Sequence, residues 1–151
     1  MRNAIRNTIY ARLGHVRLIM GKQKILIVDD DPDFVKAIRA TLESEQYMVL
    51  EAGNRNEGME KIRTDKPDLI ILDVMMLTWR DGFEMSRELK RNPEYKNIPI
   101  LILTGLEEKV GINFKSSAGD PAWMPVDGFL DKPVEPKQLL SEVQKLLAET
   151  P

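Results

Sequence analysis

Cysteine is absent from this 151-residue sequence. The chain therefore has no disulfide framework, no thiolate metal site and no thiol nucleophile. Long apolar runs are also missing, because the longest ones fall far short of the about 20 residues that a membrane-spanning helix needs. These absences predict a cytoplasmic protein without a membrane span.

Acidic residues are missing from the first 21 positions, although the whole chain carries 24 of them. Residues 1–21 hold four arginines and a loose helical spacing of apolar residues, without the apolar core of a signal peptide. We interpret them as a basic N-terminal extension. It is either an amphipathic helix or an upstream translation, with Met20 rather than Met1 as the true start. Residues 22–149 are long enough to bury the core of a single domain.

Five stretches have the composition of β-strands, with apolar and often β-branched residues in succession. They are residues 24–28, 47–52, 69–72, 98–103 and 127–131. Apolar residues recur with helical spacing between them, and a last helical stretch closes the chain. This alternation predicts an α/β fold with a five-stranded parallel sheet and about five helices on both faces, a flavodoxin-like doubly wound arrangement. Continuous apolar strands suit a sheet that is covered on both sides.

Polar side chains end four of the predicted strands. In open α/β sheets the working site lies beyond the carboxyl ends of the strands. The residues at these ends are Asp29, Asp30, Asp73, Thr104 and Lys132. Three carboxylates repel one another in a partly desolvated cleft, and a hard divalent cation relieves the repulsion, so we expect Mg²⁺, with Mn²⁺ as an alternative. Asp73 would then be a carboxylate nucleophile for phosphoryl transfer, with Thr104 and Lys132 pairing with phosphoryl oxygens.

The motifs that contain these residues match a known family. The stretches ILIVDDDPDF, PDLIILDVMM, IPILILTG and FLDKPVEP resemble the bacterial response-regulator receiver domain over about residues 23–148. The order and spacing of five signature positions at predicted strand ends make the resemblance specific. It implies that Asp73 is the phosphoacceptor, and that Asp29, Asp30, Asp73 and the backbone carbonyl of Met75 bind the metal.

The resemblance also implies a signalling mechanism. Thr104 would be the switch hydroxyl and Lys132 the phosphate-pairing amine. Phe129 lies where the family often has a rotating aromatic ring, although plain core packing would place a phenylalanine there too. A sensor histidine kinase or a histidine phosphotransfer protein would donate the phosphoryl group. The protein would not be an enzyme in the ordinary sense, because it would catalyse only its own phosphorylation and dephosphorylation.

The output of such a protein would be a binding event. No DNA-binding or enzymatic output domain is expected after residue 149, so we expect an unknown downstream protein partner, with homodimerisation as another outcome. A phosphorylation-independent interaction module on the same fold is the alternative function. A flavodoxin-like or phosphatase-like enzyme is a third hypothesis. No glycine-rich loop follows the first strand, however, and Met75 replaces the second acid of aspartate-based phosphatases.

Local signals refine these predictions. Asp31 followed by Pro32 is typical of a helix N-cap and first helical position, so we leave only two acids of this run for the metal. Asp81-Gly82 is interpreted as a turn, and Trp79 is placed in a loop. Glycines and prolines within residues 105–126 argue against a single regular helix there and predict a reshaped partner surface.

Overall fold

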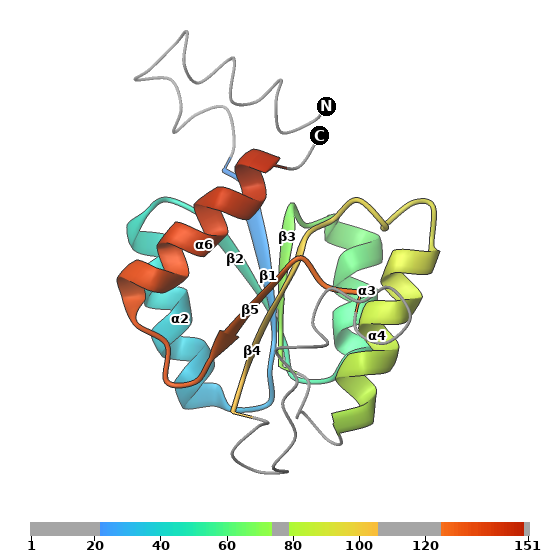
Figure 1. The fold of residues 1–151 in the computed structure, drawn as a ribbon, viewed down its shortest axis with the longest axis horizontal. Helices are drawn as coiled ribbons and strands as arrows, with labels where there is room; N and C mark the ends of the chain where they lie inside the picture. The colour runs from blue at the N-terminus through green and yellow to red at the C-terminus, as the bar shows by residue number, and fades with distance from the viewer. Residues whose placement is uncertain (1–21, 74–78, 106–124, 150–151) are drawn as a thin grey trace, which may run out of the picture.

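A five-stranded parallel sheet forms the centre of the molecule (Figure 1). The computed structural model describes residues 22–73, 79–105 and 125–149. The strands stand in the order β2-β1-β3-β4-β5, and every neighbouring pair is parallel. Their bounds are Lys24–Val28 for β1, Met48–Ala52 for β2, Leu69–Leu72 for β3, Ile100–Thr104 for β4 and Gly128–Asp131 for β5. The predicted fold class is confirmed.

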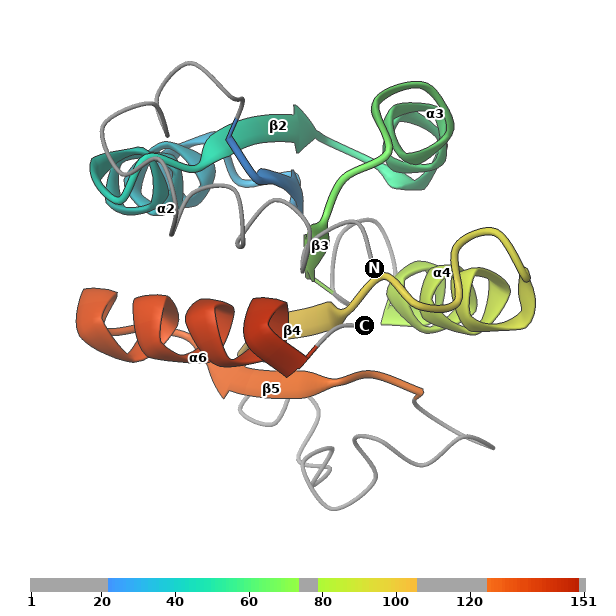
Figure 2. The ribbon, with the colours of Figure 1, turned by 90° about the horizontal axis from the view of Figure 1, so that it is seen from above.

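Four helices of the described residues cover the sheet. They are α2 over Pro32–Ser44, α3 over Arg55–Asp65, α4 over Trp79–Arg91 and α6 over Pro136–Glu149. Seen from above, α2 and α6 lie on one face of the sheet and α3 and α4 on the other (Figure 2). The basic extension over residues 1–21 and most of the 105–126 segment lie outside the described residues, so the predictions made for them stay predictions.

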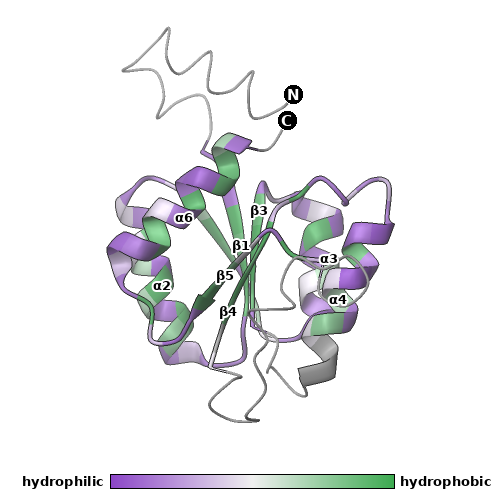
Figure 3. Cartoon of the chain, viewed as in Figure 1, coloured by the Kyte–Doolittle hydropathy of each residue, from purple (hydrophilic) through white to green (hydrophobic). Residues whose placement is uncertain are grey.

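The continuous apolar strands serve both faces of the sheet. Leu26 and Val28 of β1 join the hydrophobic cluster under α3 and α4, whereas Ile25 and Ile27 join the cluster under α2 and α6. All four side chains are completely or almost completely buried. Figure 3 shows the same division, with hydrophobic strands at the centre and hydrophilic residues on the outer sides of the helices. Each such side chain contributes about 1.5–3 kcal/mol on burial, so the strands need no polar face.

Helix α2 begins and ends with well-defined caps. The Asp31 side chain accepts hydrogen bonds from the backbone N–H groups of Asp33 and Phe34, and Pro32 occupies the first helical position. At the other end, the N–H of Gln46 donates to the carbonyl of Glu43, and the N–H of Tyr47 donates to that of Leu42. Gln46 has a φ of 67°, so a non-glycine residue occupies the left-handed position of this C-terminal cap.

The strand order places the ends of β1 and β3 side by side. From β1 the chain continues to β2 on one side of β1, and then returns to β3 on the other side. The register pairs Val28 with Leu72, the last residues of the two strands. A sheet whose order reverses in this way opens a crevice beyond the carboxyl ends of its strands at the point of reversal. The residues that follow β1 and β3 therefore emerge at one place.

The start of α4 corrects two predictions from the sequence. Trp79 is the first residue of the helix, so the loop placement of Trp79 and the turn at Asp81-Gly82 were wrong. A glycine costs about 1 kcal/mol inside a helix relative to alanine. Phe83 and Leu89, however, are buried in the core cluster, and their packing contributes more than that cost. The tertiary contacts of α4 thus override the local turn signal.

Candidate functional site

Three carboxylates meet where the sheet order reverses. Asp29 and Asp30 follow β1 directly and Asp73 follows β3, and one carboxylate oxygen from each lies within 4.8 Å of the others. Asp29 and Asp73 are buried, whereas Asp30 is exposed. The sheet fixes the backbone on either side of the cluster, because the N–H of Asp73 donates to the carbonyl of Val28 over 3.0 Å. The convergence that the strand ends predicted is therefore present.

Asp31 is committed to the helix rather than to this cluster. Its carboxylate caps α2, and its own backbone N–H donates to Oδ1 of Asp29 over 2.9 Å. The capping role predicted for Asp31 is confirmed. The hydrogen bond also holds the Asp29 side chain in place from the side of the helix.

Lys132 reaches the cluster from the far edge of the sheet. It follows β5, and its Nζ donates to Oδ2 of Asp29 over 2.8 Å and to Oδ2 of Asp73 over 3.3 Å. The Lys132 side chain is 23% exposed, so most of its surface is withdrawn from water. The peptide bond between Lys132 and Pro133 is cis. One lysine thus bridges the two buried carboxylates.

Burial and neighbouring charges shift the pKa values of Asp29 and Lys132. Burial raises the pKa of the Asp29 carboxyl above its ordinary value and outweighs the opposing hydrogen bonds from Lys132 and the Asp31 N–H. Burial alone would lower the pKa of Lys132, but the hydrogen bond from Lys132 to Asp29 and the charges of Asp73 and Asp29 together raise it. Lys132 therefore stays an ammonium ion throughout the neutral range.

The donor set of the cluster fits a hard divalent cation. Three carboxylates face one ammonium group, so the four side chains retain an excess of negative charge when all are ionised. Oxygen ligands of this type, with one exposed side open to water, are what Mg²⁺ prefers in proteins. Mn²⁺ accepts the same carboxylate ligands.

The other predicted site residues are placed only in part. Thr104 ends β4, and its backbone lies in register with Asp131 at the same edge of the sheet. The Thr104 side chain lies outside what the structure describes. Phe129 lies in β5, paired in register with Ile102, and packs half-buried against the cluster under α3 and α4. Met75 and its backbone carbonyl lie outside the described residues.

Phe34 is a site residue that the sequence did not single out. Its helical spacing with Ile38 and Leu42 indicated only an apolar face of α2. In the structure the centroid of its ring lies 3.9 Å from Nζ of Lys132. The available signal was the Asp31 cap, which begins the helix beside the strand ends and places Phe34 in its first turn.

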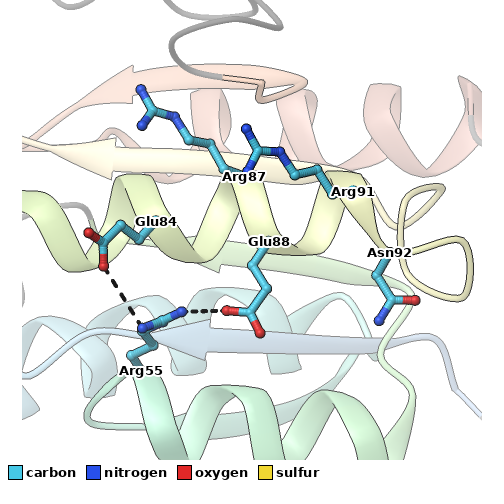
Figure 4. A pocket seen from close by; sticks show the side chains of 6 residues that line it. All are labelled: Arg55, Glu84, Arg87, Glu88, Arg91 and Asn92. Carbon is cyan, nitrogen blue, oxygen red and sulfur yellow. Dashed lines mark hydrogen bonds and ion pairs between the residues drawn. The ribbon is translucent and has the colours of Figure 1, made fainter.

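A hollow lies between α3 and α4, away from the acidic cluster (Figure 4). It measures about 490 Å³, and its lining comprises Arg55, Glu84, Arg87, Glu88, Arg91 and Asn92. Arg55 from α3 forms ion pairs with Glu88 and, over 3.9 Å, with Glu84 of α4. These half-exposed pairs connect the two helices, and the groove contains none of the clustered acids. We therefore regard it as a polar helix contact.

The reversed strand order, the buried carboxylates and the bridging lysine define a doubly wound α/β protein with an acidic site at its switch point. The family described as "Response regulator receiver domain" matches residues 25–144. The chain belongs to this family, whose members are signalling switches of two-component systems rather than classical enzymes. The resemblance stated from the motifs is thereby confirmed.

Known proteins similar to this chain include regulators of different size. Protein PilH of Pseudomonas aeruginosa is 32% identical over 128 residues, which cover 83% of this chain and 98% of PilH. The alkaline phosphatase synthesis transcriptional regulatory protein PhoP of Bacillus subtilis is 34% identical over 125 residues. That match covers 83% of this chain and 48% of PhoP. The chain thus spans nearly all of one relative and about half of the other.

Solved structures agree with the assignment. A response regulator of Chloroflexus aurantiacus superposes with a TM-score of 0.74 at 30% identity, covering 85% of this chain and 100% of that one. The chemotaxis protein CheY4 of Vibrio cholerae gives a TM-score of 0.71 at 30% identity, covering 83% and 99%. Among the helices of the described residues, none is long and apolar enough to cross a membrane.

Proposed function

We propose that this protein is a cytoplasmic phosphoacceptor switch in which Asp73 takes a phosphoryl group from a histidine kinase or a histidine phosphotransfer protein. The proposal rests on one observation above all. Asp73 lies buried at the switch point, within 4.8 Å of two further acids and 3.3 Å from the Lys132 ammonium. A carboxylate in such surroundings has a neighbouring cation to offset the charge that it gains.

The transfer replaces a P–N bond with a P–O bond. An oxygen of the Asp73 carboxylate attacks the phosphorus, the bond to the donor imidazole breaks, and the electron pair of that bond returns to the imidazole nitrogen. Lys132, already within hydrogen-bonding reach of Asp73, exchanges a carboxylate oxygen for a phosphoryl oxygen. Thr104, at the end of β4, would donate its hydroxyl to another phosphoryl oxygen.

Mg²⁺ would be held by Asp29, Asp30 and Asp73 with the backbone carbonyl of Met75. When bound, it offsets negative charge on the phosphoryl oxygens. Asp29 stays oriented for this role by two contacts, the N–H of Asp31 on one side and Lys132 on the other. The phosphorylated form would then favour a second arrangement of Thr104 and Phe129, which changes the surface offered to a downstream protein.

Intact-mass analysis after incubation with acetyl phosphate and Mg²⁺ tests this function. We expect one phosphoryl adduct on the wild type and none on Asp73→Asn. Asp33→Asn is the matched control, because Asp33 is an exposed acid in the first turn of α2 that should keep the adduct. Absence of an adduct on the wild type, together with absence of Mg²⁺ binding, would instead support a phosphorylation-independent interaction module.

A further inference from the structure

The ring of Phe34 and the ammonium group of Lys132 are in direct contact. The ring centroid lies 3.9 Å from Nζ, inside the distance at which an aromatic face attracts a cation. Nζ also donates to Asp29 and to Asp73. Two carboxylates and one aromatic ring therefore contact the ammonium group.

The contact with the ring differs in kind from the contacts with the carboxylates. The attraction between a cation and a ring face comes from the quadrupole of the ring and needs no particular N–H bond. Lys132 can therefore keep its place against the ring while its N–H groups change acceptors. A carboxylate in place of the ring would instead accept an N–H group of Lys132 and would compete with the phosphoryl oxygens for it.

Phe34 is itself held in position. Its backbone N–H donates to the Asp31 cap over 3.2 Å, which fixes it in the first turn of α2. Its half-buried side chain packs against the hydrophobic cluster under α2 and α6. Lys132, by contrast, has a flexible four-carbon stem and lies in the bend that follows β5. The fixed ring of Phe34 thus determines the position of the flexible Lys132 side chain.

We propose that Phe34 is a positioning residue for Lys132, whose ring holds the ammonium group at the acidic cluster while its hydrogen bonds pass from Asp73 to an incoming phosphoryl group. This inference rests on the proposed function. Phe34 would then do more than pack against the core, because it would also orient Lys132. The cost of orienting the lysine is then met before the phosphoryl donor arrives.

Fluorination of the ring separates this role from packing. Site-specific replacement of Phe34 with mono-, di- and trifluorophenylalanine weakens the quadrupole in steps while it nearly preserves the shape. We expect the rate of phosphorylation by acetyl phosphate at saturating Mg²⁺ to fall with each fluorine, by about three- to tenfold in total. Phe34→Leu should show a loss of similar size, whereas Phe34→Trp should retain most of the rate.

A magnetic resonance measurement reports the contact without phosphorylation. The ε-methylene protons of Lys132 should be shifted upfield by the ring in the metal-free wild type, and this shift should disappear in Phe34→Leu. Leu140→Ala is the matched control, because Leu140 also packs half-buried against the cluster under α2 and α6. It should lower the melting temperature but leave both the Lys132 signals and the phosphorylation rate unchanged.

The outcomes distinguish the two proposals. If the wild type accepts no phosphoryl group, the proposed function fails, whereas the Lys132 signals still report on the contact. If the wild type is phosphorylated but the rate is the same across the fluorinated series, Phe34 is a packing residue and the positioning role is overturned. The same conclusion follows if the Lys132 protons show no upfield shift in the wild type.

Discussion

Nζ of Lys132 donates a hydrogen bond to Oδ2 of Asp29 over 2.8 Å, across 103 positions of sequence. The pair joins the ends of β1 and β5, which are separated in the sheet by β3 and β4. The Asp29 side chain is only 2% exposed, so the lysine offsets a carboxylate that water scarcely reaches. Because the two charges are in direct contact, a substitution of either residue should change metal binding or stability by a measurable amount.

Removal of the lysine charge should strengthen cation binding. Lys132→Gln removes an ammonium group that is hydrogen-bonded to Asp29 and Asp73. A divalent ion is then not repelled by the lysine charge and does not compete with the lysine for the carboxylate oxygens. We expect the Mg²⁺ affinity, measured by isothermal titration calorimetry, to rise about tenfold. Lys145→Gln removes the same charge from an exposed position on α6 and should change the affinity less than about twofold. An unchanged or weaker affinity in Lys132→Gln would contradict this picture.

Asp29 should make stability depend on pH. Burial raises its folded-state pKa, so its contribution to stability is fully present below the ordinary value of 3.8 and is lost as pH rises through the folded-state pKa. Without metal at pH 7, Asp29→Asn should therefore have a higher Tm than the wild type, because the variant buries no carboxylate charge at this position.

Thermal denaturation in the presence of EDTA, followed by circular dichroism from pH 7 down to pH 3.5, measures this effect. The difference in Tm between wild type and Asp29→Asn should shrink as the pH falls. Saturating Mg²⁺ should also reduce the difference at pH 7, because the metal stabilises only the form that keeps the carboxylate. If Asp29→Asn were less stable than the wild type in EDTA at pH 7, burial of the Asp29 carboxylate charge would not destabilise the folded protein, contrary to this prediction.

A glycine should improve the C-terminal cap of α2. Gln46 has a φ of 67°, a conformation that glycine adopts without steric cost. Gln46→Gly should raise the free energy of unfolding by about 0.5–1 kcal/mol in urea denaturation. Its neighbour Glu45 has a φ of −100°, so Glu45→Gly should give no such gain. Equal effects of the two substitutions would mean that the cap geometry is not the cause.

Close packing at the start of β5 should forbid a side chain. A Cβ added to Gly128 would lie 3.0 Å from Cδ1 of Leu101 and 3.2 Å from Cδ1 of Leu146. Gly128→Val should therefore cost about 1–3 kcal/mol of unfolding free energy, measured by urea denaturation. The Cβ of Gly105→Ala meets no atom of the described residues within 4 Å, so this variant should stay within about 0.5 kcal/mol of the wild type. A neutral Gly128→Val would show that α6 can move away from the sheet.

Much of the fold could be predicted because the strands carry their own signal. The runs at 24–28 and 69–72 are apolar at every position except Lys24, as a sheet covered on both faces requires, and the structure begins and ends β1 and β3 at those residues. Asp29 and Asp73 could be placed together for the same reason, since parallel strands end at one edge. The Asp31 cap was equally local, because its hydrogen bonds reach only two and three residues along the chain.

Contacts between distant elements could not be predicted in the same way. Lys90 in α4 would be interpreted as a solvated helix lysine, yet its Nζ donates to the carbonyl of Ile98 and to the carboxylate of Asp127, at the entry to β5. The helical start at Trp79 likewise depends on the packing of Phe83, which local turn propensity does not contain. Such features arise from three-dimensional neighbours rather than from periodicity.

The sequence by itself determined the strands, their two covered faces and the acids that follow β1 and β3, because apolar continuity and the residues at strand ends can be read from local composition. The strand order that creates the switch point came from the tertiary structure. Only the tertiary structure decided how the charges at that point are joined. It brought Lys132 onto Asp29 and Asp73 and laid the ring of Phe34 against the ammonium group. No sequence pattern indicates either contact, because each one joins residues that only the packing of α2 and the position of β5 in the sheet bring together.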